Sequence, residues 1–141
     1  MTDDEVAALV TEQHKLQLGT INPDGTPHLV TMFYATVEGK IAFWTYRKSQ
    51  KLRNIERDPR VTCLIETGED YFELRGALIY GTAKVLTNPN EVRYVGAGVV
   101  RRMMDIQDDD VAPFVDSTAA KRYAIVVEPV RVASWDHRKL A

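Results

Sequence analysis

One stretch of the sequence organises the rest of the chain: residues 44–61, which read WTYRKSQKLRNIERDPRV. Ser49 follows an apolar run and stands where a helix N-cap belongs, and Leu52 and Ile55 come after it at helical spacing. The aspartate-proline pair at 58–59 ends this helix, because proline cannot continue it. The stretch therefore predicts a strand, a short capped helix and a second strand in immediate succession.

Three cations crowd the first turn of the predicted helix: Arg47, Lys48 and Lys51. A helix N-terminus already presents unpaired backbone N–H groups and the positive end of the helix dipole, so it favours an anion. Added cations oppose the dipole, and something negative has to offset them. The pattern indicates a phosphate-sized anion site, although the same residues could also form a capped helix whose charges face water.

Composition and charge argue against several classes of protein. The 141 residues suit a single domain, 1–141, with 45% hydrophobic and 27% charged residues. A net charge of −2 argues against general affinity for nucleic acid, and the single cysteine, Cys63, fits a reducing compartment. The sequence has no signal-peptide layout, no apolar run of about 20 residues and no metal-ligand spacing among its histidines. We expect a soluble, cytoplasmic protein that binds no metal. We also expect it to contact neither a membrane nor nucleic acid.

The other elements predict a mainly β, α+β domain. Apolar runs separated by turn residues predict strands at 16–21, 27–36, 40–45, 61–66, 71–86 and 121–135. Helical patterns predict short flanking helices at 2–13, 88–103 and 111–120, with a solvated acidic loop at 108–110. Six antiparallel strands of this kind hide their edges best by closing into a small barrel.

Three details of the strands carry further expectations. Gly76 and Gly81 inside one long strand indicate bends or bulges. The strands around Phe43 and Ile125 are apolar on both faces, so we expect one face to meet the core and the other a partner subunit. Residues 32–34 are bulky, and three consecutive residues cannot all face one side of a strand, so at least one faces out of the core.

Several short blocks follow one another along the chain. They are LGT at 18–20, DGTPH at 24–28, VTMFY at 30–34, SxKxxxIxxDPRV at 49–61, LRG at 74–76, GTA at 81–83, VRV at 130–132 and SW at 134–135. In this order they resemble the pyridoxamine 5′-phosphate oxidase-like split-barrel flavoproteins, and more narrowly the deazaflavin-dependent oxidoreductases that use coenzyme F-420. The resemblance implies a six-stranded antiparallel split barrel of the FMN-binding type. It also implies a homodimer with the cofactor at its interface.

The resemblance also implies which residues contact the cofactor. They are Val30, Thr31, Met32 and Phe33 beside the ring, largely through backbone groups, Thr45 and Tyr46 beside the polyol chain, Lys48, Ser49 and Lys51 on the phosphate, and Trp135 near the dimer seam. The tail at 135–141 is too short to establish pyridoxamine phosphate as the substrate.

No acid–base pair stands out, so we assign no catalytic residue; in hydride transfer the cofactor carries the difficult chemistry. The predicted function is an oxidoreductase that uses F-420 to deliver hydride to an unsaturated small organic substrate, with a proton from solvent, Tyr34 or Tyr46. Extra cations such as Arg47, Arg53 and Arg57 favour F-420, because this coenzyme has an acidic oligoglutamate tail. The alternatives are an FMN-dependent oxidase or reductase of the same fold and a non-catalytic flavin- or haem-binding module.

Overall fold

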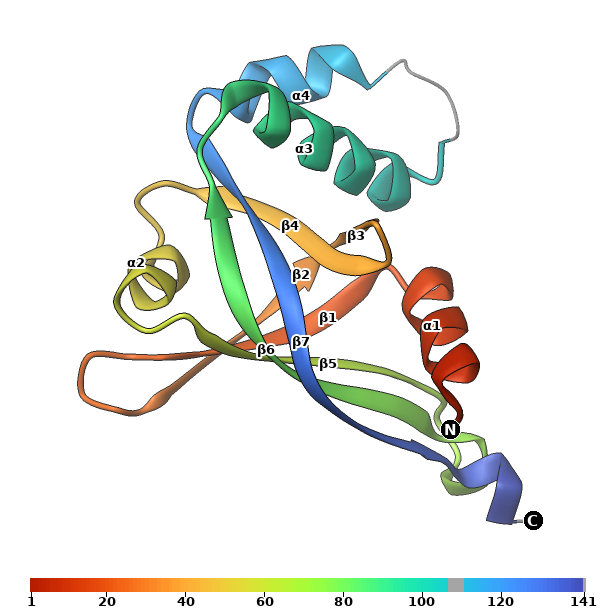
Figure 1. Ribbon diagram of the computed structural model, residues 1–141. Coiled ribbons are helices and arrows are strands. Elements are labelled where there is room, and N and C mark those ends of the chain that lie inside the picture. The colour runs from red at the N-terminus through yellow and green to blue at the C-terminus, as the bar shows by residue number, and fades with distance from the viewer. Residues whose placement is uncertain (107–110, 141) are drawn as a thin grey trace.

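The computed structural model describes residues 1–106 and 111–140, so the predicted acidic loop at 108–110 lies outside the described residues. The strands are β1 (Lys15–Ile21), β2 (Pro27–Phe33), β3 (Ala35–Val37), β4 (Lys40–Tyr46), β5 (Arg60–Thr67), β6 (Arg75–Leu86) and β7 (Arg122–Asp136). The helices are α1 (Asp3–Glu12), α2 (Gln50–Arg57), α3 (Pro89–Met104) and α4 (Ala112–Ala119), with short 3-10 turns η1 (Tyr71–Glu73) and η2 (His137–Leu140). The strands form one antiparallel sheet in the order β2-β1-β5-β6-β7-β4-β3 (Figure 1).

The predicted mainly β, α+β split barrel is confirmed, but the described residues form seven strands rather than six. The expected strand 27–36 is interrupted at Tyr34, whose backbone N–H donates to the His14 carbonyl at 3.2 Å. The Tyr34 side chain is fully buried, and its hydroxyl donates to the Val10 carbonyl at 2.6 Å. This anchoring of the chain at Tyr34 separates β2 from β3.

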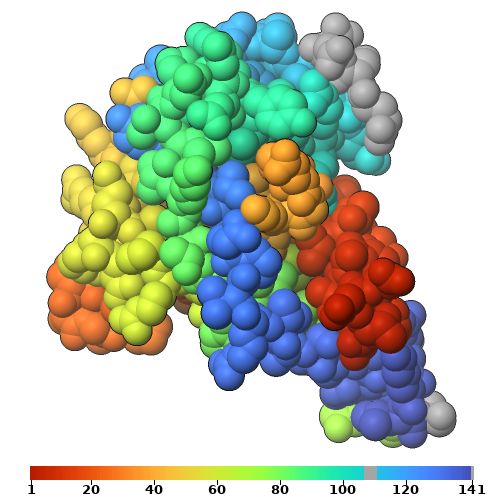
Figure 2. Space-filling view, in the orientation of Figure 1, coloured from red at the N-terminus to blue at the C-terminus, as the bar shows by residue number. Residues whose placement is uncertain are grey.

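The main core fills the inside of the curled sheet. Alternation along β1 and β5 turns Leu16, Leu18, Cys63 and other apolar side chains inward. Helices α1 and α2 lie on opposite sides of the barrel (Figure 1), and in Figure 2 they form opposite flanks of one face with β7 between them. Leu9 of α1 and Leu52 of α2 are both fully buried in this core, so each helix closes one side of the barrel.

A second core lies on the outside of β3, β4 and the start of β7, beneath α3 and α4. Gly96 of α3 permits the close approach, because a Cβ there would lie 2.3 Å from a ring carbon of Trp44. The second apolar face of the strands around Phe43 and Ile125 is therefore covered by helices of the same chain. The expectation that a partner subunit covers that face was wrong, because α3 and α4 of the same chain pack on it.

The long β6–β7 hairpin contains one irregularity. Tyr80 pairs with Arg131 and Gly81 pairs with Pro129, so Val130 is an extra residue in a β-bulge, as Gly81 predicted. Gly76 has another role, because a Cβ there would lie 2.5 Å from the Trp135 ring. The predicted strand 71–86 is shorter than expected, since η1 precedes it.

The remaining outer face of the sheet, formed by β1, β2, β5 and β6, stays at least partly exposed. The side chains that alternate with core residues on these strands are all half-buried or exposed. Phe33 lies on this face, which confirms that one of residues 32–34 faces out of the core. Leu29 is 68% exposed and Val130 is 75% exposed, so the face is partly apolar.

Candidate functional site

Helix α2 begins and ends as the sequence predicts. The Ser49 hydroxyl oxygen accepts two hydrogen bonds. One comes from the Leu52 backbone N–H at 3.2 Å and the other from the Thr45 hydroxyl at 3.1 Å. The Asp58 N–H closes the helix on the Asn54 carbonyl. A serine cap tied to the end of β4 therefore fixes the direction in which the α2 N-terminus points.

The side of α2 that faces the barrel is locked by polar contacts. The buried Asn54 amide donates to the Thr20 hydroxyl at 3.1 Å and to the Asn22 side chain at 3.0 Å. The Arg57 guanidinium donates to the Ile21 carbonyl. This contact ties Arg57 to the end of β1. It gives no support to the expectation that Arg57 adds positive charge to a cofactor groove.

The structure adds a fourth cation to the N-terminus of α2, which sequence reasoning missed. Arg122, the first residue of β7, pairs with Tyr46 across the sheet. Its guanidinium carbon lies 4.1 Å from the Tyr46 ring centre and 4.7 Å from that of Trp44. Its Nε atom is buried and has no hydrogen-bond partner among the residues that the structure describes. No sequence signal points to Arg122, because strand register alone brings it to the site.

These cations are not neutralised within the part of the chain that the structure describes. No carboxylate there lies within 4.0 Å of a charged nitrogen of Arg47, Lys48, Lys51 or Arg122. Arg47 instead lies over the Tyr123 ring at 4.5 Å. Burial lowers the pKa of the half-buried Lys51 amine, and the positive charge of Arg122 lowers it further. The site therefore has an excess of positive charge that an anion can compensate.

Strand β2 offers an open edge, because within the described sheet it pairs only with β1. The Tyr34 N–H bonds to the His14 carbonyl, and antiparallel strands alternate such hydrogen-bonded pairs with non-bonded ones. The backbone N–H and C=O groups of Leu29, Thr31 and Phe33 therefore point away from β1. This arrangement can offer backbone hydrogen bonds to a ligand, whereas the side chains of β2 that alternate with them, Val30 and Met32, pack against the core.

Five of the predicted residues come together at the end of β4 and the start of α2: Thr45, Tyr46, Lys48, Ser49 and Lys51. Thr45 is buried and Tyr46 is half exposed. Trp135 does not join them within one chain. It follows Arg122 by 13 positions in β7, which at about 3.3 Å per residue separates the two by up to roughly 40 Å.

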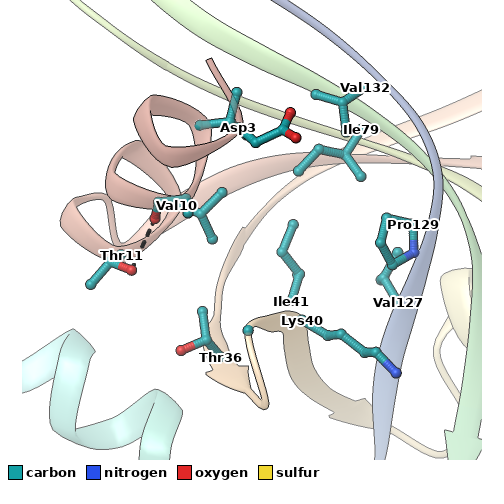
Figure 3. A pocket seen from close by; sticks show the side chains of 13 residues that line it. Asp3, Val10, Thr11, Thr36, Lys40, Ile41, Ile79, Val127, Pro129 and Val132 are labelled. Atoms are coloured by element: carbon teal, nitrogen blue, oxygen red, sulfur yellow. Dashed lines mark hydrogen bonds between the residues drawn. The ribbon is translucent and has the colours of Figure 1, made fainter. Parts of the chain in front are cut away.

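Three hollows of the single chain are lined by residues outside the β4–α2 junction. A cavity of about 290 Å³ lies between α1, the β3–β4 turn and β7, and apolar side chains such as Val10, Ile79 and Val132 line it (Figure 3). The exposed sheet face has an apolar hollow of about 610 Å³ beside Leu29 and Val130. A more polar hollow of about 400 Å³ on the same face includes Thr31.

Other candidate groups are less suited to chemistry. Burial raises the pKa of the Tyr34 hydroxyl to about 12, and burial raises that of the Cys63 thiol to about 12. Among the described residues, no three His, Cys, Asp or Glu side chains gather as a metal site would require. None of the helices in this part of the chain combines the length and hydrophobicity needed to span a bilayer.

Comparison with known proteins gives the site a context. A family model described as pyridoxamine 5′-phosphate oxidase matches residues 2–136. A conserved hypothetical protein from Mycobacterium tuberculosis is 41% identical, with a TM-score of 0.93 over 99% of this chain and 88% of that one. No protein with a curated description matches the sequence.

Two more distant structures share the fold. An F420 reductase is 22% identical, with a TM-score of 0.74 over 94% of this chain and 98% of that one. The haem storage protein HutZ from Vibrio cholerae is 15% identical, with a TM-score of 0.69 over 95% of this chain and 93% of that one. At these identities the likeness concerns the fold alone, and their ligands differ.

Proposed function

The chain belongs to the pyridoxamine 5′-phosphate oxidase family, and from that premise we propose that it is a homodimeric oxidoreductase that binds coenzyme F-420 and reduces an unsaturated small organic substrate. The observation that carries the proposal is the unneutralised cationic cluster at the N-terminus of α2. Lys48, Ser49 and Lys51 would hold the cofactor's phosphate there. The Nε of Arg122, which is buried and finds no partner among the described residues, fits an anionic group at this place.

The number of cations supports F-420 over FMN. A phosphate monoester carries about −1.5 to −2 charges at neutral pH, whereas Arg47, Lys48, Lys51 and Arg122 supply four positive charges without a carboxylate partner among the described residues. The phosphate and acidic oligoglutamate tail of F-420 together match such an excess better. A structural neighbour that is an F420 reductase is consistent with this choice, although a neighbour that stores haem shares the fold as well.

A homodimer is supported by two features. Trp135 follows Arg122 by 13 positions in β7, near the opposite end of the strand, so we propose that it reaches the cofactor held by the partner. The exposed face of β1, β2, β5 and β6, which includes the apolar hollow beside Leu29, is the surface we propose for the second copy. Thr31 lies at a hollow on this same face, which would place the ring near the seam.

The chain's own residues would mainly bind, orient and shield. When bound, reduced F-420 supplies the hydride. The outward backbone groups of Thr31 and Phe33 would hold the ring, and Thr45 and Tyr46 would lie beside the polyol chain. Tyr34 is a poor proton donor, because its hydroxyl is buried on the Val10 carbonyl. The proton would then come from solvent or from Tyr46, which is 50% exposed.

Titration of the purified protein with F-420, FMN, FAD and haem tests the cofactor, with quenching of tryptophan fluorescence as the measurement. Trp44 lies beside Arg122 and should report occupancy of the anion site. We expect selective tight binding of F-420. Selective binding of FMN would replace the cofactor in this proposal, and binding of haem alone, or of none of them, would overturn the proposed activity.

The dimer is tested separately by measuring the mass in solution. Leu29→Arg places a charge on the proposed interface, and we expect it to give a monomer with weakened cofactor binding. The matched control is Tyr94→Arg, because Tyr94 is 70% exposed on α3, away from that face. If the wild-type protein has the mass of one chain in solution, both the proposed interface and the proposed role of Trp135 are wrong.

A further inference from the structure

Arg122 is held in one position without an ionic partner in residues 1–106 and 111–140. The rings of Trp44 and Tyr46 fix its guanidinium group at 4.7 and 4.1 Å, so little side-chain entropy remains to be lost when it binds a ligand. Arginine offers five N–H donors in a planar fork and no acceptor. A buried N–H without an acceptor is unfavourable, and the Nε of Arg122 is in that situation. The side chain is pre-positioned for an acceptor that the described part of the chain does not supply.

Lys51 is its cationic neighbour. The pKa of the Lys51 amine is lowered by burial and then by the charge of Arg122, which means that the two groups repel each other across the site. Arg47 and Lys48 follow directly on Tyr46, at the same end of β4. Among the residues that the structure describes, no carboxylate within 4.0 Å offsets any of these charges. Repulsion of this kind raises the free energy of the empty site and is relieved when an anion binds.

We propose that Arg122 is a direct ligand of the anion bound at the N-terminus of α2, acting as a planar fork together with Lys51. In the absence of the anion the Arg122–Lys51 pair makes this corner of the fold self-repelling, so that loading with the cofactor also stabilises the protein. The inference rests on the proposed function for the identity of the anion, which is the cofactor's phosphate. The anchor itself needs only an anion with several acceptor oxygens.

Inorganic pyrophosphate is the probe, since it contains the anionic chemistry without a ring. Its binding is measured by thermal unfolding at constant ionic strength, with sodium chloride as the reference salt. We expect the wild-type midpoint to rise with pyrophosphate. Arg122→Met keeps an apolar stem on the two rings but removes the fork, and we expect binding to weaken about 10- to 100-fold, as for loss of charge-assisted hydrogen bonds. Arg122→Lys keeps the charge and should fall between the two.

A second measurement separates a ligand from a merely structural residue. In Arg122→Met without pyrophosphate, the pKa of Lys51, followed by NMR, should rise toward its ordinary value, because a neighbouring positive charge is gone. The matched control is Arg93→Met, which removes a positive charge from an exposed site on α3 and should change neither the Lys51 pKa nor pyrophosphate binding.

The outcomes distinguish this inference from the cofactor proposal. The role of Arg122 would be overturned if Arg122→Met bound pyrophosphate with wild-type affinity, whatever cofactor binds. If Arg122→Met does not fold, Arg122→Lys takes its place in this test. Loss of pyrophosphate binding in Arg122→Met, together with no binding of F-420 or FMN by the wild type, would support the anchor and overturn the proposed activity.

Discussion

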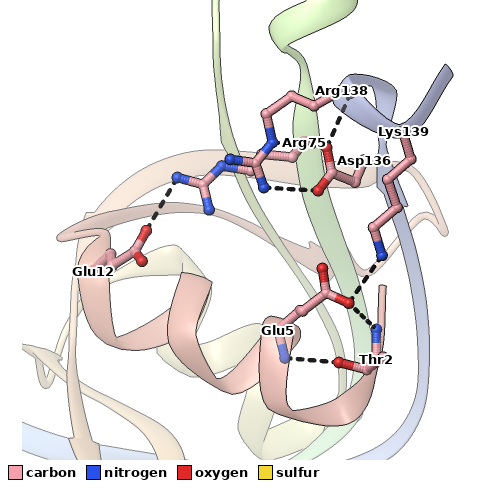
Figure 4. Close-up of polar contacts among 7 residues, drawn as sticks. All are labelled: Thr2, Glu5, Glu12, Arg75, Asp136, Arg138 and Lys139. Atoms are coloured by element: carbon pink, nitrogen blue, oxygen red, sulfur yellow. Dashed lines mark hydrogen bonds and ion pairs between the residues drawn. The ribbon is translucent and has the colours of Figure 1, made fainter. Parts of the chain in front are cut away.

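Helices α1 and α2 both close a side of the barrel, but their charges are handled in opposite ways. Two carboxylates of α1 form ion pairs: Glu5 with Lys139 at 2.9 Å, and Glu12 with Arg75 at 3.1 Å (Figure 4). The C-terminal carbonyls of α1 also receive the guanidinium of Arg102 from α3. In the first turn of α2, by contrast, the cations have no carboxylate partner among the described residues.

This difference separates a helix that serves the fold from a helix end that is suited to a ligand. The ion pairs of Glu5 and Glu12 use these carboxylates to hold α1 against other parts of the chain. At α2 the serine cap and the buried Asn54 contacts hold the helix, while its cations are left for another molecule. Variants on the α1 side should therefore change stability, and variants in the first turn of α2 should change binding.

The largest effect is expected from Arg102→Met. Arg102 donates to the carbonyls of Val10, Thr11 and Gln13 and lies 4.7 Å from the Tyr34 ring. Loss of these charge-assisted bonds should lower the free energy of unfolding by about 3 kcal/mol, measured by denaturant titration. Arg93→Met, on the exposed side of the same helix, should change it by less than about 1 kcal/mol. If the two variants are equally stable, α1 is not held in the way described.

Lys51→Ala is the corresponding test at α2. We expect cofactor affinity to fall by about 1–3 kcal/mol, as for loss of a charge-assisted contact to phosphate. The free energy of unfolding without ligand should not fall and should rise slightly, because among the described residues Lys51 makes no ion pair to lose and its charge is repelled by that of Arg122. Isothermal titration and denaturant unfolding measure the two quantities. Unchanged affinity would mean that the phosphate lies elsewhere.

Ser49 belongs to both sides of the comparison, since it caps α2 and lies at the proposed phosphate site. Ser49→Ala should cost about 1 kcal/mol of stability through loss of the cap. Ser49→Asp keeps a capping oxygen and offsets the cations, so stability should be retained while phosphate affinity falls. The exposed Ser117→Ala serves as the control. Equal affinity of Ser49→Asp and wild type for pyrophosphate would contradict the placement of the anion.

The smallest effect is expected from Glu5→Gln, and it depends on pH. Hydrogen bonds from Lys139 and then from Thr2 lower the pKa of Glu5 to about 2. Since the pKa is lower in the folded state, Glu5 stabilises the fold above its unfolded pKa of about 4.3, and this contribution is lost as pH falls toward 2. The stability difference between wild type and Glu5→Gln should therefore narrow from pH 7 to pH 3 in urea unfolding. A difference that does not depend on pH would show that the carboxylate charge contributes nothing.

Local patterns predicted the elements whose causes lie within a few residues. Helix α2 was predicted from the Ser49 cap, the spacing of Leu52 and Ile55 and the stop at Asp58. Helix α3 was predicted from Asn88 before Pro89. Five of the ten proposed cofactor residues lie together at the α2 end for the same reason. Their role in binding stays a prediction.

Features that depend on contacts between distant parts of the chain could not be predicted from the sequence. Arg122 reaches the site only because β7 pairs with β4 in one register. The break at Tyr34 depends on the carbonyl of Val10, and the covering of Trp44 depends on where α3 packs. The distance of Trp135 from its expected neighbours follows from the length of β7, which a list of strands does not reveal.

The contacts that seat α1 also bear on the order in which the chain folds. Glu5 and Lys139 are 134 positions apart, and Val10 and Arg102 are 92 apart. Contacts between such distant positions form late and slow the folding of a chain. On a ribosome, α1 emerges early, but its contacts with Arg102 and Lys139 cannot form until α3 and η2 have been made. The helix that comes first in the sequence is among the last to be seated.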